Sequence, residues 1–468
     1  MPAEGRGKRV ALALGGLAVG LAVLASASQL VEHLEERELV QTTRPDDRVQ
    51  FVDEALFVRR GDAWETTPYA HGFAVPARFA AEKGDRWRMF ALGGSFMMGT
   101  PYVDQAHGEE RPGGIPGFLR AQLQALAPDR ALELINLGAG AQDSHRVLRI
   151  AEQVMEHQPD ALLVATCNNE GVLAPSRLRE LLHRQGGYRL LARLFTDPGA
   201  TGRSLHTPQD PDLDALRDQL QANIAAIIAL CEAHGVPLFL ATLPQNLRYT
   251  GLEQGHGAAP GQVHEPGEDP CVQPARTLVE QGRPAEALAS LESCDHVADA
   301  LRWAGLARLQ QGDHQAARAH LEQSLELSPR NRCRGSFEDD FRAQAAAAPG
   351  VFLVDLQRAA ERASPHGIPG DELFLDSCHM NWQGYGLMAE EAARVILASG
   401  HGPPGAAGME SLPQLDALAT GMGLTEAMLS PEFFPQPPAR EPGGRLPPGS
   451  VPPGPPPIGN IGPPQGHP

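Results

Sequence analysis

The central part of the chain alternates between short apolar runs and longer amphipathic stretches, beginning at Trp87. In five of these runs nearly every position is apolar, which is typical of parallel strands buried on both faces. The five runs are residues 88–92, 132–137, 161–166, 237–242 and 351–356. Helical periodicity predicts helices at 115–126, 144–156, 213–234 and 382–398. This alternation predicts an α/β fold, a three-layer sandwich around a five-stranded parallel sheet.

A long insertion separates the fourth and fifth predicted strands, and its own pattern is helical. Residues 274–294 and 298–329 each predict a helical hairpin. The second hairpin has small and apolar residues at positions typical of tetratricopeptide repeats: Gly305, Gly312, Ala317, Leu321 and Pro329. Two repeats are fewer than the roughly three that an array needs to stand alone, so we expect the insertion to pack on the α/β core. A generic Ala- and Leu-rich helical insertion is the alternative.

The two ends of the chain differ from its middle. A basic head precedes an uncharged apolar run that ends at Ala27, which predicts a signal peptide or an N-terminal transmembrane anchor for residues 1–27. Both alternatives place the rest of the protein on the exported, periplasmic or cell-envelope side, because the basic head stays cytoplasmic. Residues 401–468 become rich in Pro and Gly and predict a disordered tail.

Composition narrows the class of protein. A chain of 468 residues exceeds one ordinary domain, and its net charge of −18 without clustered Lys and Arg argues against a nucleic-acid partner. The six cysteines fit neither a zinc site nor a small disulfide scaffold. We expect no metal and no cofactor. In an oxidising compartment, a disulfide between two of Cys271, Cys294 and Cys333 is possible, and the sequence does not indicate which two.

The first candidate for chemistry is Ser95, which follows the first predicted strand in the segment FALGGSFMMG. Ligands of open α/β sheets bind at the carboxyl ends of strands, where this serine lies. Gly93 and Gly94 permit a tight turn close to a bound group. A Gly-Gly-Ser turn by itself is more often structural.

The second candidate is the pair Asp376 and His379, three residues apart and just before the last predicted helix. A serine hydroxyl needs a neighbouring base to become a nucleophile, and a carboxylate fixes the tautomer of a histidine base. By itself the pair also fits a helix N-terminus with an Asp cap.

Taken together, the motifs resemble the SGNH/GDSL hydrolase family. The matching blocks, in chain order, are Gly93-Gly94-Ser95, the segment from Asn136 to Ser144, Asn169 with Glu170, and Asp376-Ser377-Cys378-His379. The resemblance implies a flavodoxin-like SGNH fold and a triad of Ser95, His379 and Asp376. It also implies an oxyanion hole formed by Ser95, Asn169 and a backbone N–H at Gly140 or Ala141. Two positions depart from the family, since Ala141 and Cys167 stand where it usually has glycine.

These observations predict a division of the chain into six parts. They are a leader at 1–27, a juxtamembrane or cap region at 28–84, the two parts of the hydrolase domain at 85–255 and 335–400, the helical insertion at 256–334 and the tail at 401–468.

We therefore expect an exported serine esterase or O-acyl transferase that acts on ester-linked acyl groups of an envelope glycan or lipid. The rival hypothesis is a catalytically weak SGNH-like protein that binds a protein partner through the repeats, because repeat hairpins present concave surfaces. The departures at Ala141 and Cys167 favour the rival, and the presence of the triad and of Asn169 favours the enzyme. Arg332 and Arg334 are interpreted as a solvated pair, with contact to an anionic substrate as the alternative.

Overall fold

The computed structural model describes residues 56–66, 77–102, 113–140, 142–170, 213–249, 272–292, 294, 298–328 and 332–430. Within these ranges no helix is long and apolar enough to cross a bilayer. The leader predicted at residues 1–27 lies outside them, as does the stretch from 431 onward.

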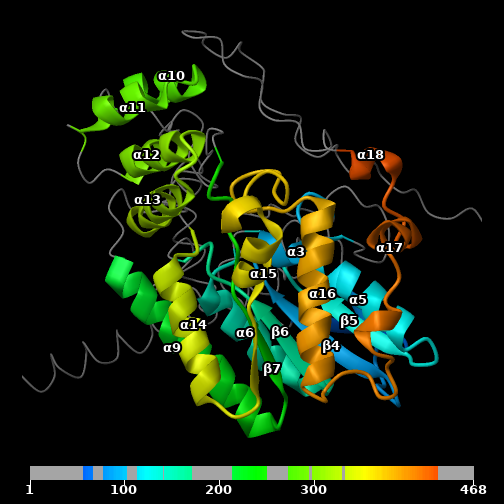
Figure 1. Cartoon of the computed structure of the whole chain (residues 1–468). Helices are drawn as coiled ribbons and strands as arrows, with labels where there is room; N and C mark the ends of the chain where they lie inside the picture. Colours follow the sequence, from blue (N-terminus) through cyan, green and yellow to red (C-terminus); the bar gives the residue numbers. More distant parts are fainter. Residues whose placement is uncertain are drawn as a thin grey trace, which may run out of the picture.

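A five-stranded parallel sheet forms the centre of the molecule (Figure 1). Its strands are β4 (Trp87–Gly93), β5 (Leu132–Asn136), β6 (Ala161–Ala165), β7 (Leu238–Ala241) and β8 (Val351–Val354). They lie in the order β5-β4-β6-β7-β8, with parallel pairing throughout. This is the flavodoxin-like strand order, and it confirms the predicted fold class. The central strands β4, β6 and β7 are buried along their whole length, which explains their uninterrupted apolar sequences.

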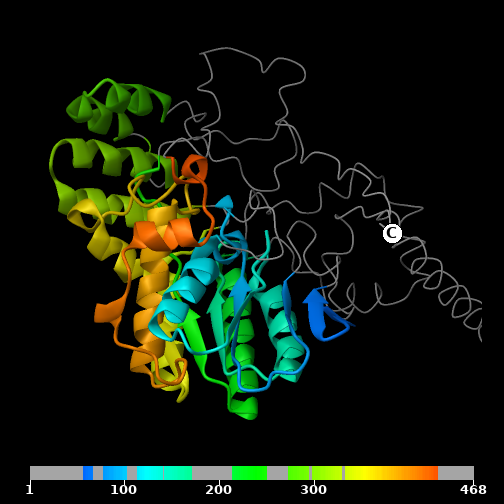
Figure 2. The same cartoon turned by 90° about the vertical axis from the view of Figure 1, so that its right-hand side faces the viewer.

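Helices cover both faces of the sheet and complete the three layers (Figures 1 and 2). On one face α5 (Gly114–Leu126) packs along α16 (Trp382–Ala398). On the other, α9 (Leu213–His234) lies between α6 (Ser144–Val154) and α14 (Gly335–Ala347). The sequence pattern predicts four of these five helices, and α14 was not anticipated.

A small antiparallel sheet precedes the parallel one. It consists of β1 (Phe57–Arg60), β2 (Ala63–Thr66) and β3 (Arg78–Ala80). Phe79 meets Phe90 of β4 edge to face, with ring centroids 5.4 Å apart, and Phe57 lies 5.1 Å from Phe79. The described part of the predicted cap region therefore packs on the α/β core instead of standing away from it.

The insertion forms two helical hairpins above the carboxyl edge of the sheet (Figure 1). Its helices are α10 (Gln273–Glu280), α11 (Pro284–Leu291), α12 (Ala298–Gln310) and α13 (His314–Leu327). A Cβ on Gly305 would lie 2.7 Å from the Leu321 side chain, so glycine lets α12 and α13 pack closely. The apolar core of the hairpins also includes Ile368 and Leu247 from the α/β part. The insertion therefore packs against the main domain, as expected for two repeats.

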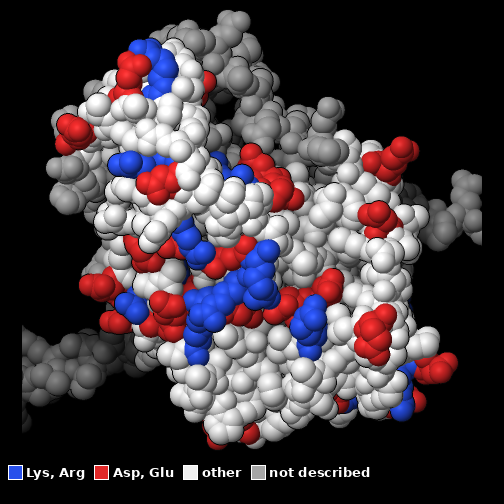
Figure 3. Space-filling view, in the orientation of Figure 1, with Lys and Arg blue, Asp and Glu red and all other residues white. Residues whose placement is uncertain are grey.

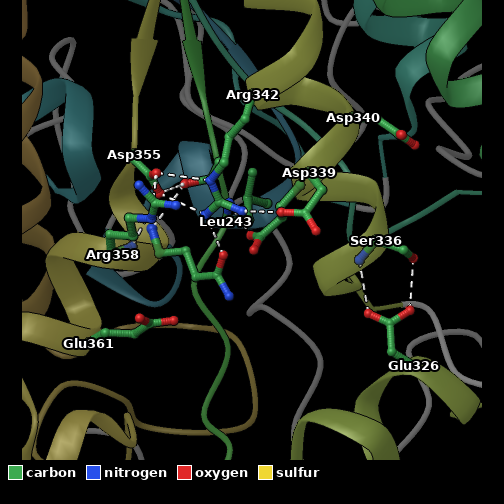
Figure 4. A network of polar contacts seen from close by, with 12 residues as sticks. Leu243, Glu326, Ser336, Asp339, Asp340, Arg342, Asp355, Arg358 and Glu361 are labelled. Atoms are coloured by element: carbon green, nitrogen blue, oxygen red, sulfur yellow. Dashed lines mark hydrogen bonds and ion pairs between the residues drawn. The ribbon is translucent and has the colours of Figure 1, made fainter.

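Helix α14 connects the repeats to the sheet through polar contacts (Figure 4). The Glu326 carboxylate of α13 accepts hydrogen bonds from the backbone N–H and the hydroxyl of Ser336, at 2.9 and 2.7 Å. Arg342 of the same helix binds Asp355, at the end of β8, through two hydrogen bonds of 2.9 and 3.0 Å. The last repeat, α14 and the sheet edge are thus held in register.

The domain boundary predicted at residue 401 is wrong. The chain continues past it into α17 (Leu415–Gly421) and α18 (Glu426–Leu429). Ala419 and Leu424 belong to the main hydrophobic core. The indole N–H of Trp382 donates to the backbone carbonyl of Leu429 at 3.1 Å. Pro and Gly between residues 401 and 414 hid this segment, because they suppress the periodic pattern without preventing the next helix from packing.

Candidate active site

Ser95 is the first residue of the short helix α3 (Ser95–Met98), directly after β4. Two glycines make this turn feasible. A Cβ on Gly93 would lie 2.1 Å from the backbone oxygen of Ala165 in β6, so no larger residue fits. A Cβ on Gly94 would lie 2.7 Å from the Asn169 side-chain nitrogen. The turn thus brings the serine and that amide close together at the carboxyl edge of the sheet.

Ser95, His379 and Asp376 lie within hydrogen-bonding distance of one another in series. The Nε2 atom of His379 is 2.7 Å from the Oγ atom of Ser95. Its Nδ1 atom is 2.6 Å from the Oδ2 atom of Asp376. This arrangement fits a tautomer in which Nδ1–H donates to the carboxylate and Nε2 accepts from the hydroxyl.

The loop before α16 holds the two partners in place. Asp376 accepts backbone N–H donors from Cys378 at 2.8 Å and from His379 at 2.6 Å on its Oδ1 atom. One carboxylate oxygen therefore fixes the turn while the other faces the imidazole. The cap of α16 is Asn381, whose side chain accepts from the Gly384 N–H. The three-residue spacing thus forms a turn that orients the imidazole, and the helix is capped by a different residue.

Burial and charge shift the pKa values of this pair in opposite directions. The His379 side chain is 2% exposed. Burial by itself lowers the pKa of His379, but the adjacent Cys378 sulfur and the Asp376 carboxylate favour the imidazolium, and the balance raises it well above the ordinary value. For Asp376, burial raises the pKa, and the charge and hydrogen bonds of His379 outweigh it, so that the pKa falls below its usual range. The carboxylate stays ionised and keeps the imidazole oriented.

Of the predicted oxyanion-hole residues, Asn169 lies next to the turn that carries Ser95, since a Cβ on Gly94 would lie 2.7 Å from its side-chain nitrogen. The Asn169 amide donates one N–H to the backbone oxygen of Gln142 at 3.1 Å, and an amide carries a second N–H. Gly140 has open space around the position of an added Cβ. Ala141 lies outside the described residues.

Glu170, next to Asn169, connects the second and third sequence blocks. Its carboxyl group binds the Ser144 backbone N–H at 3.0 Å and the Ser144 hydroxyl at 2.6 Å. Asn223 of α9 donates to the same hydroxyl at 2.8 Å. Burial, followed by the charge of Asp143, raises the pKa of Glu170 to about 8 despite the Ser144 hydrogen bonds. In the sequence Glu170 appeared only as the neighbour of Asn169, and nothing indicated that it binds Ser144.

A disulfide joins Cys167, at the position where glycine is usual, to Cys333 at the end of the insertion. The sequence left open a pair among Cys271, Cys294 and Cys333, and it gave no signal that Cys333 bonds to Cys167. Cys294 is also disulfide-bonded. The Asn168 side-chain oxygen reinforces the connection, since it accepts from the Cys333 backbone N–H at 3.0 Å and from Gln245 at 2.9 Å. Through this disulfide, Cys167 anchors the loop that carries Asn169 to the end of the insertion.

Two further residues differ from the sequence interpretation. Arg332 and Arg334 are 7% and 3% exposed, so they are not a solvated pair. Spacing alone gave no signal of this burial, because it arises where the insertion returns to the sheet.

One group among the described residues brings together atoms of the kind that ligate metals: Asp376, Cys378 and His379, within 4.8 Å of one another. The Nδ1–Oδ2 hydrogen bond already engages two of these atoms. This engagement favours the role of an oriented base over that of a metal ligand.

Comparison with known protein families gives one match. Residues 298–331 match the tetratricopeptide repeat family, which confirms the pattern predicted for the insertion. No curated protein matches the chain.

The solved structures that resemble the chain have low sequence identity to it. One, described as a putative lipolytic protein of the G-D-S-L family from Desulfitobacterium hafniense DCB-2, is 14% identical over 66% of this chain and 99% of that one, with a TM-score of 0.31. The acetylxylan esterase Axe2 from Geobacillus stearothermophilus is 13% identical over 66% and 93%, with a TM-score of 0.30. LAE5, an alpha/beta hydrolase enzyme from the metagenome of Lake Arreo, Spain, is 17% identical over 67% and 95%, with a TM-score of 0.28.

Proposed function

We propose that the chain is a serine esterase of the SGNH/GDSL type, with Ser95 as nucleophile, His379 as base and Asp376 as its orienting partner. The observation that carries the proposal is the unbroken hydrogen-bond series from Ser95 Oγ through the imidazole to the Asp376 carboxylate. Residues 284 positions apart meet there. A helix cap would need neither the serine nor the buried histidine.

The first half of the reaction acylates the serine. The Ser95 oxygen attacks the ester carbonyl carbon while its proton passes to Nε2 of His379. Collapse of the tetrahedral intermediate breaks the bond to the alcohol oxygen, which takes that proton from the imidazolium. The products of this half are an acyl-serine and a free alcohol.

The second half restores the serine. A water molecule gives a proton to His379 and attacks the acyl carbon, and the serine oxygen leaves with that proton. A sugar hydroxyl in place of water gives O-acyl transfer. Negative charge develops on the carbonyl oxygen in both halves, and the Ser95 backbone N–H, the Asn169 amide and the backbone near Gly140 are the donors we assign to it.

The setting of the enzyme is part of the proposal. Disulfides persist in oxidising compartments, so the bonds at Cys167–Cys333 and Cys294 support an exported protein on the periplasmic or cell-envelope side. Residues 1–27 would supply the signal or anchor. The substrate would be an acylated glycan or lipid of the envelope, and the repeats would offer a surface for a protein partner.

Active-site labelling tests the proposal directly. The full chain is treated with a fluorophosphonate probe and the modified peptide is identified by mass spectrometry. We expect a single label on Ser95, no label in Ser95→Ala, and release of acetate from 4-nitrophenyl acetate by the unmodified protein alone. Ser377→Ala is a matched control, because it removes a hydroxyl from the same loop without touching the series. Labelling that persists in Ser95→Ala would exclude the assigned nucleophile.

A further inference from the structure

A small pocket, partly open to solvent, lies between the second repeat hairpin and the loop that follows β7. Helices α12 and α13 supply one wall, which includes Arg302 and Ser324. The loop after β7 supplies the other, which includes Gln245, Asn246 and Tyr249. The return segment adds Arg332. The pocket therefore exists because the insertion is present.

The pocket combines positive charge with burial. Arg332 is 7% exposed, and its burial lowers its pKa, outweighing the opposite effect of the Cys378, Asp376 and Tyr249 side chains nearby. One of its N–H groups donates to the Gln245 side-chain oxygen at 3.4 Å. The Arg302 guanidinium donates to the backbone oxygen of Tyr249 at 3.4 Å. Two guanidinium groups therefore line one pocket, and a guanidinium carries several N–H donors that an anion can share with the protein's own acceptors.

The pocket also adjoins both halves of the candidate active site. Asn246 donates from its side chain to the Asp376 backbone oxygen at 3.1 Å and from its backbone to the Ser377 oxygen at 3.0 Å. Gln245 donates to Asn168, the neighbour of Asn169. One wall residue thus touches the acid–base loop and the next one touches the oxyanion loop.

The position of Arg332 relative to the oxyanion loop is fixed covalently. Its neighbour Cys333 is bonded to Cys167, two residues before Asn169. A group bound at Arg332 would therefore sit at a constant distance from the donors around Ser95. This is the requirement for a contact that orients a substrate.

We propose that this pocket binds an anionic group, a carboxylate or a phosphate, on the molecule whose ester Ser95 attacks. This inference rests on the proposed esterase function and narrows its substrate class to acyl esters that carry a compact negative charge. Guanidinium groups suit such anions because they offer paired, planar donors. Arg302 and Arg332 would make the contacts, and Tyr249 and Asn246 would position them beside the acid–base loop.

Selectivity between two matched esters tests the proposal. Glucuronate and glucose acetylated at the same hydroxyl differ in a carboxylate, and glucose phosphate acetylated there provides the phosphate arm. We expect the full chain to release acetate from an anionic ester at least about tenfold more efficiently, by kcat/KM, than from the neutral one. The ratio should fall toward one in Arg302→Gln and Arg332→Gln and remain high in Arg332→Lys. Arg308→Gln, in the same helix and outside the pocket, should leave it unchanged.

Binding without turnover separates this inference from the proposed function. Ser95→Ala full chain is titrated with glucuronate, inorganic phosphate and glucose by calorimetry. Binding of an anion that Arg302→Gln weakens at least about fivefold supports the pocket even if no ester is hydrolysed, and that combination would reject the esterase alone. Hydrolysis of both esters at equal efficiency, with no anion bound, would reject the pocket alone. If Arg332→Gln fails to fold, the Arg302→Gln and Arg332→Lys pair still decides the outcome.

Discussion

Two carboxyl groups near the candidate site, the half-buried Asp376 and the buried Glu170, have pKa values that their surroundings push in opposite directions. Asp376 receives two backbone N–H donors and faces the imidazole of His379, so its pKa is lowered. Glu170 is buried beside Asp143 and binds Ser144, so its pKa is raised to about 8. The same functional group is ionised on one side and protonated on the other. Environment, and not residue type, keeps Asp376 ionised beside His379 and lets the buried Glu170 bind Ser144.

The strongest test of this contrast removes the charge on the ionised side. Asp376→Asn keeps the size of the side chain but no longer fixes the His379 tautomer. We expect kcat to fall on the order of 10⁴-fold, with KM changed little, because the imidazole then presents the wrong nitrogen to Ser95. Initial rates on 4-nitrophenyl acetate measure this. Asp371→Asn, a matched change in the same loop region, should cost far less, and equal losses in the two variants would refute the assignment.

The next test concerns the side-chain amide of Asn169, the residue before Glu170. Asn169→Ala removes the side-chain donor assigned to the oxyanion. We expect a loss in kcat of roughly 10²–10³-fold, since one donor to a developing oxyanion contributes that much. The variant should still react slowly with the fluorophosphonate at Ser95, because the hydrogen bond from Ser95 to His379 does not depend on Asn169. A loss of less than about threefold would remove Asn169 from the oxyanion hole.

The protonated side is tested through the pH dependence of stability. Folded Glu170 keeps its proton to about pH 8, whereas in the unfolded chain it loses it near the ordinary value of 4.5. Between these limits the unfolded chain binds fewer protons, so this group's contribution to stability declines as pH rises. Glu170→Gln cannot ionise. The free energy of unfolding of Glu170→Gln minus that of the wild type should therefore increase by roughly 2–5 kcal/mol between pH 4.5 and pH 8.

Urea unfolding at several pH values measures this difference. Glu152→Gln, a more exposed change on α6, is the control and should leave the pH dependence as it is in the wild type. Parallel curves for wild type and Glu170→Gln would mean that Glu170 is ionised in the folded protein. The contrast with Asp376 would then collapse.

The smallest effect is the pH profile of the reaction. The base must be neutral to accept the serine proton. Because the pKa of His379 is raised, the imidazole stays protonated up to a higher pH than an ordinary histidine does. We expect kcat/KM of the free enzyme to rise about tenfold per pH unit below that pKa and then to level off. In Asp376→Asn the residual activity should level off at lower pH, because loss of the carboxylate lowers the His379 pKa. Cys378→Ser separates the contribution of the neighbouring sulfur.

The sequence predicts the parallel sheet well because strands buried on both faces leave a simple trace, an apolar run bounded by polar residues. The bounds of α9 and α16 are likewise predicted to the residue, since each carries a helical pattern from its first turn to its last. The strands β1 to β3 have three or four residues each, too few for a pattern to emerge. Their place is decided by Phe57 and Phe79 packing on Phe90.

The site was predicted in part for a similar reason. Ser95, Asn169, Asp376 and His379 follow strands or precede a helix, so the topology of the sheet brings them to one edge. The pairing of Cys167 with Cys333 spans 166 residues and depends on where the insertion returns, which no local pattern encodes. Burial of Arg332 follows from the same return. Tertiary contacts between separate segments were the information that the sequence pattern lacked.

Charges on the outer surface show a different arrangement from those around Ser95. Figure 3 shows basic and acidic side chains next to one another across one face of the molecule. Arg358 and Arg394 each form ion pairs with nearby acids, and pairs with such an exposed arginine contribute little individually. The prediction that nucleic acid is not a partner is consistent with this mixture and stays a prediction.

The placement of the repeats between β7 and α14 has an architectural consequence. Of the two hairpins, α12 and α13 border the pocket, while α10 and α11 lie farther from the sheet (Figure 1). Each repeat in such stacks contacts its neighbours alone. Additional hairpins inserted ahead of α12 would lengthen the molecule away from the sheet and leave α12 and α13 bordering the same pocket. The number of hairpins can therefore change the length of the insertion without altering the pocket that α12, α13 and the loop after β7 form.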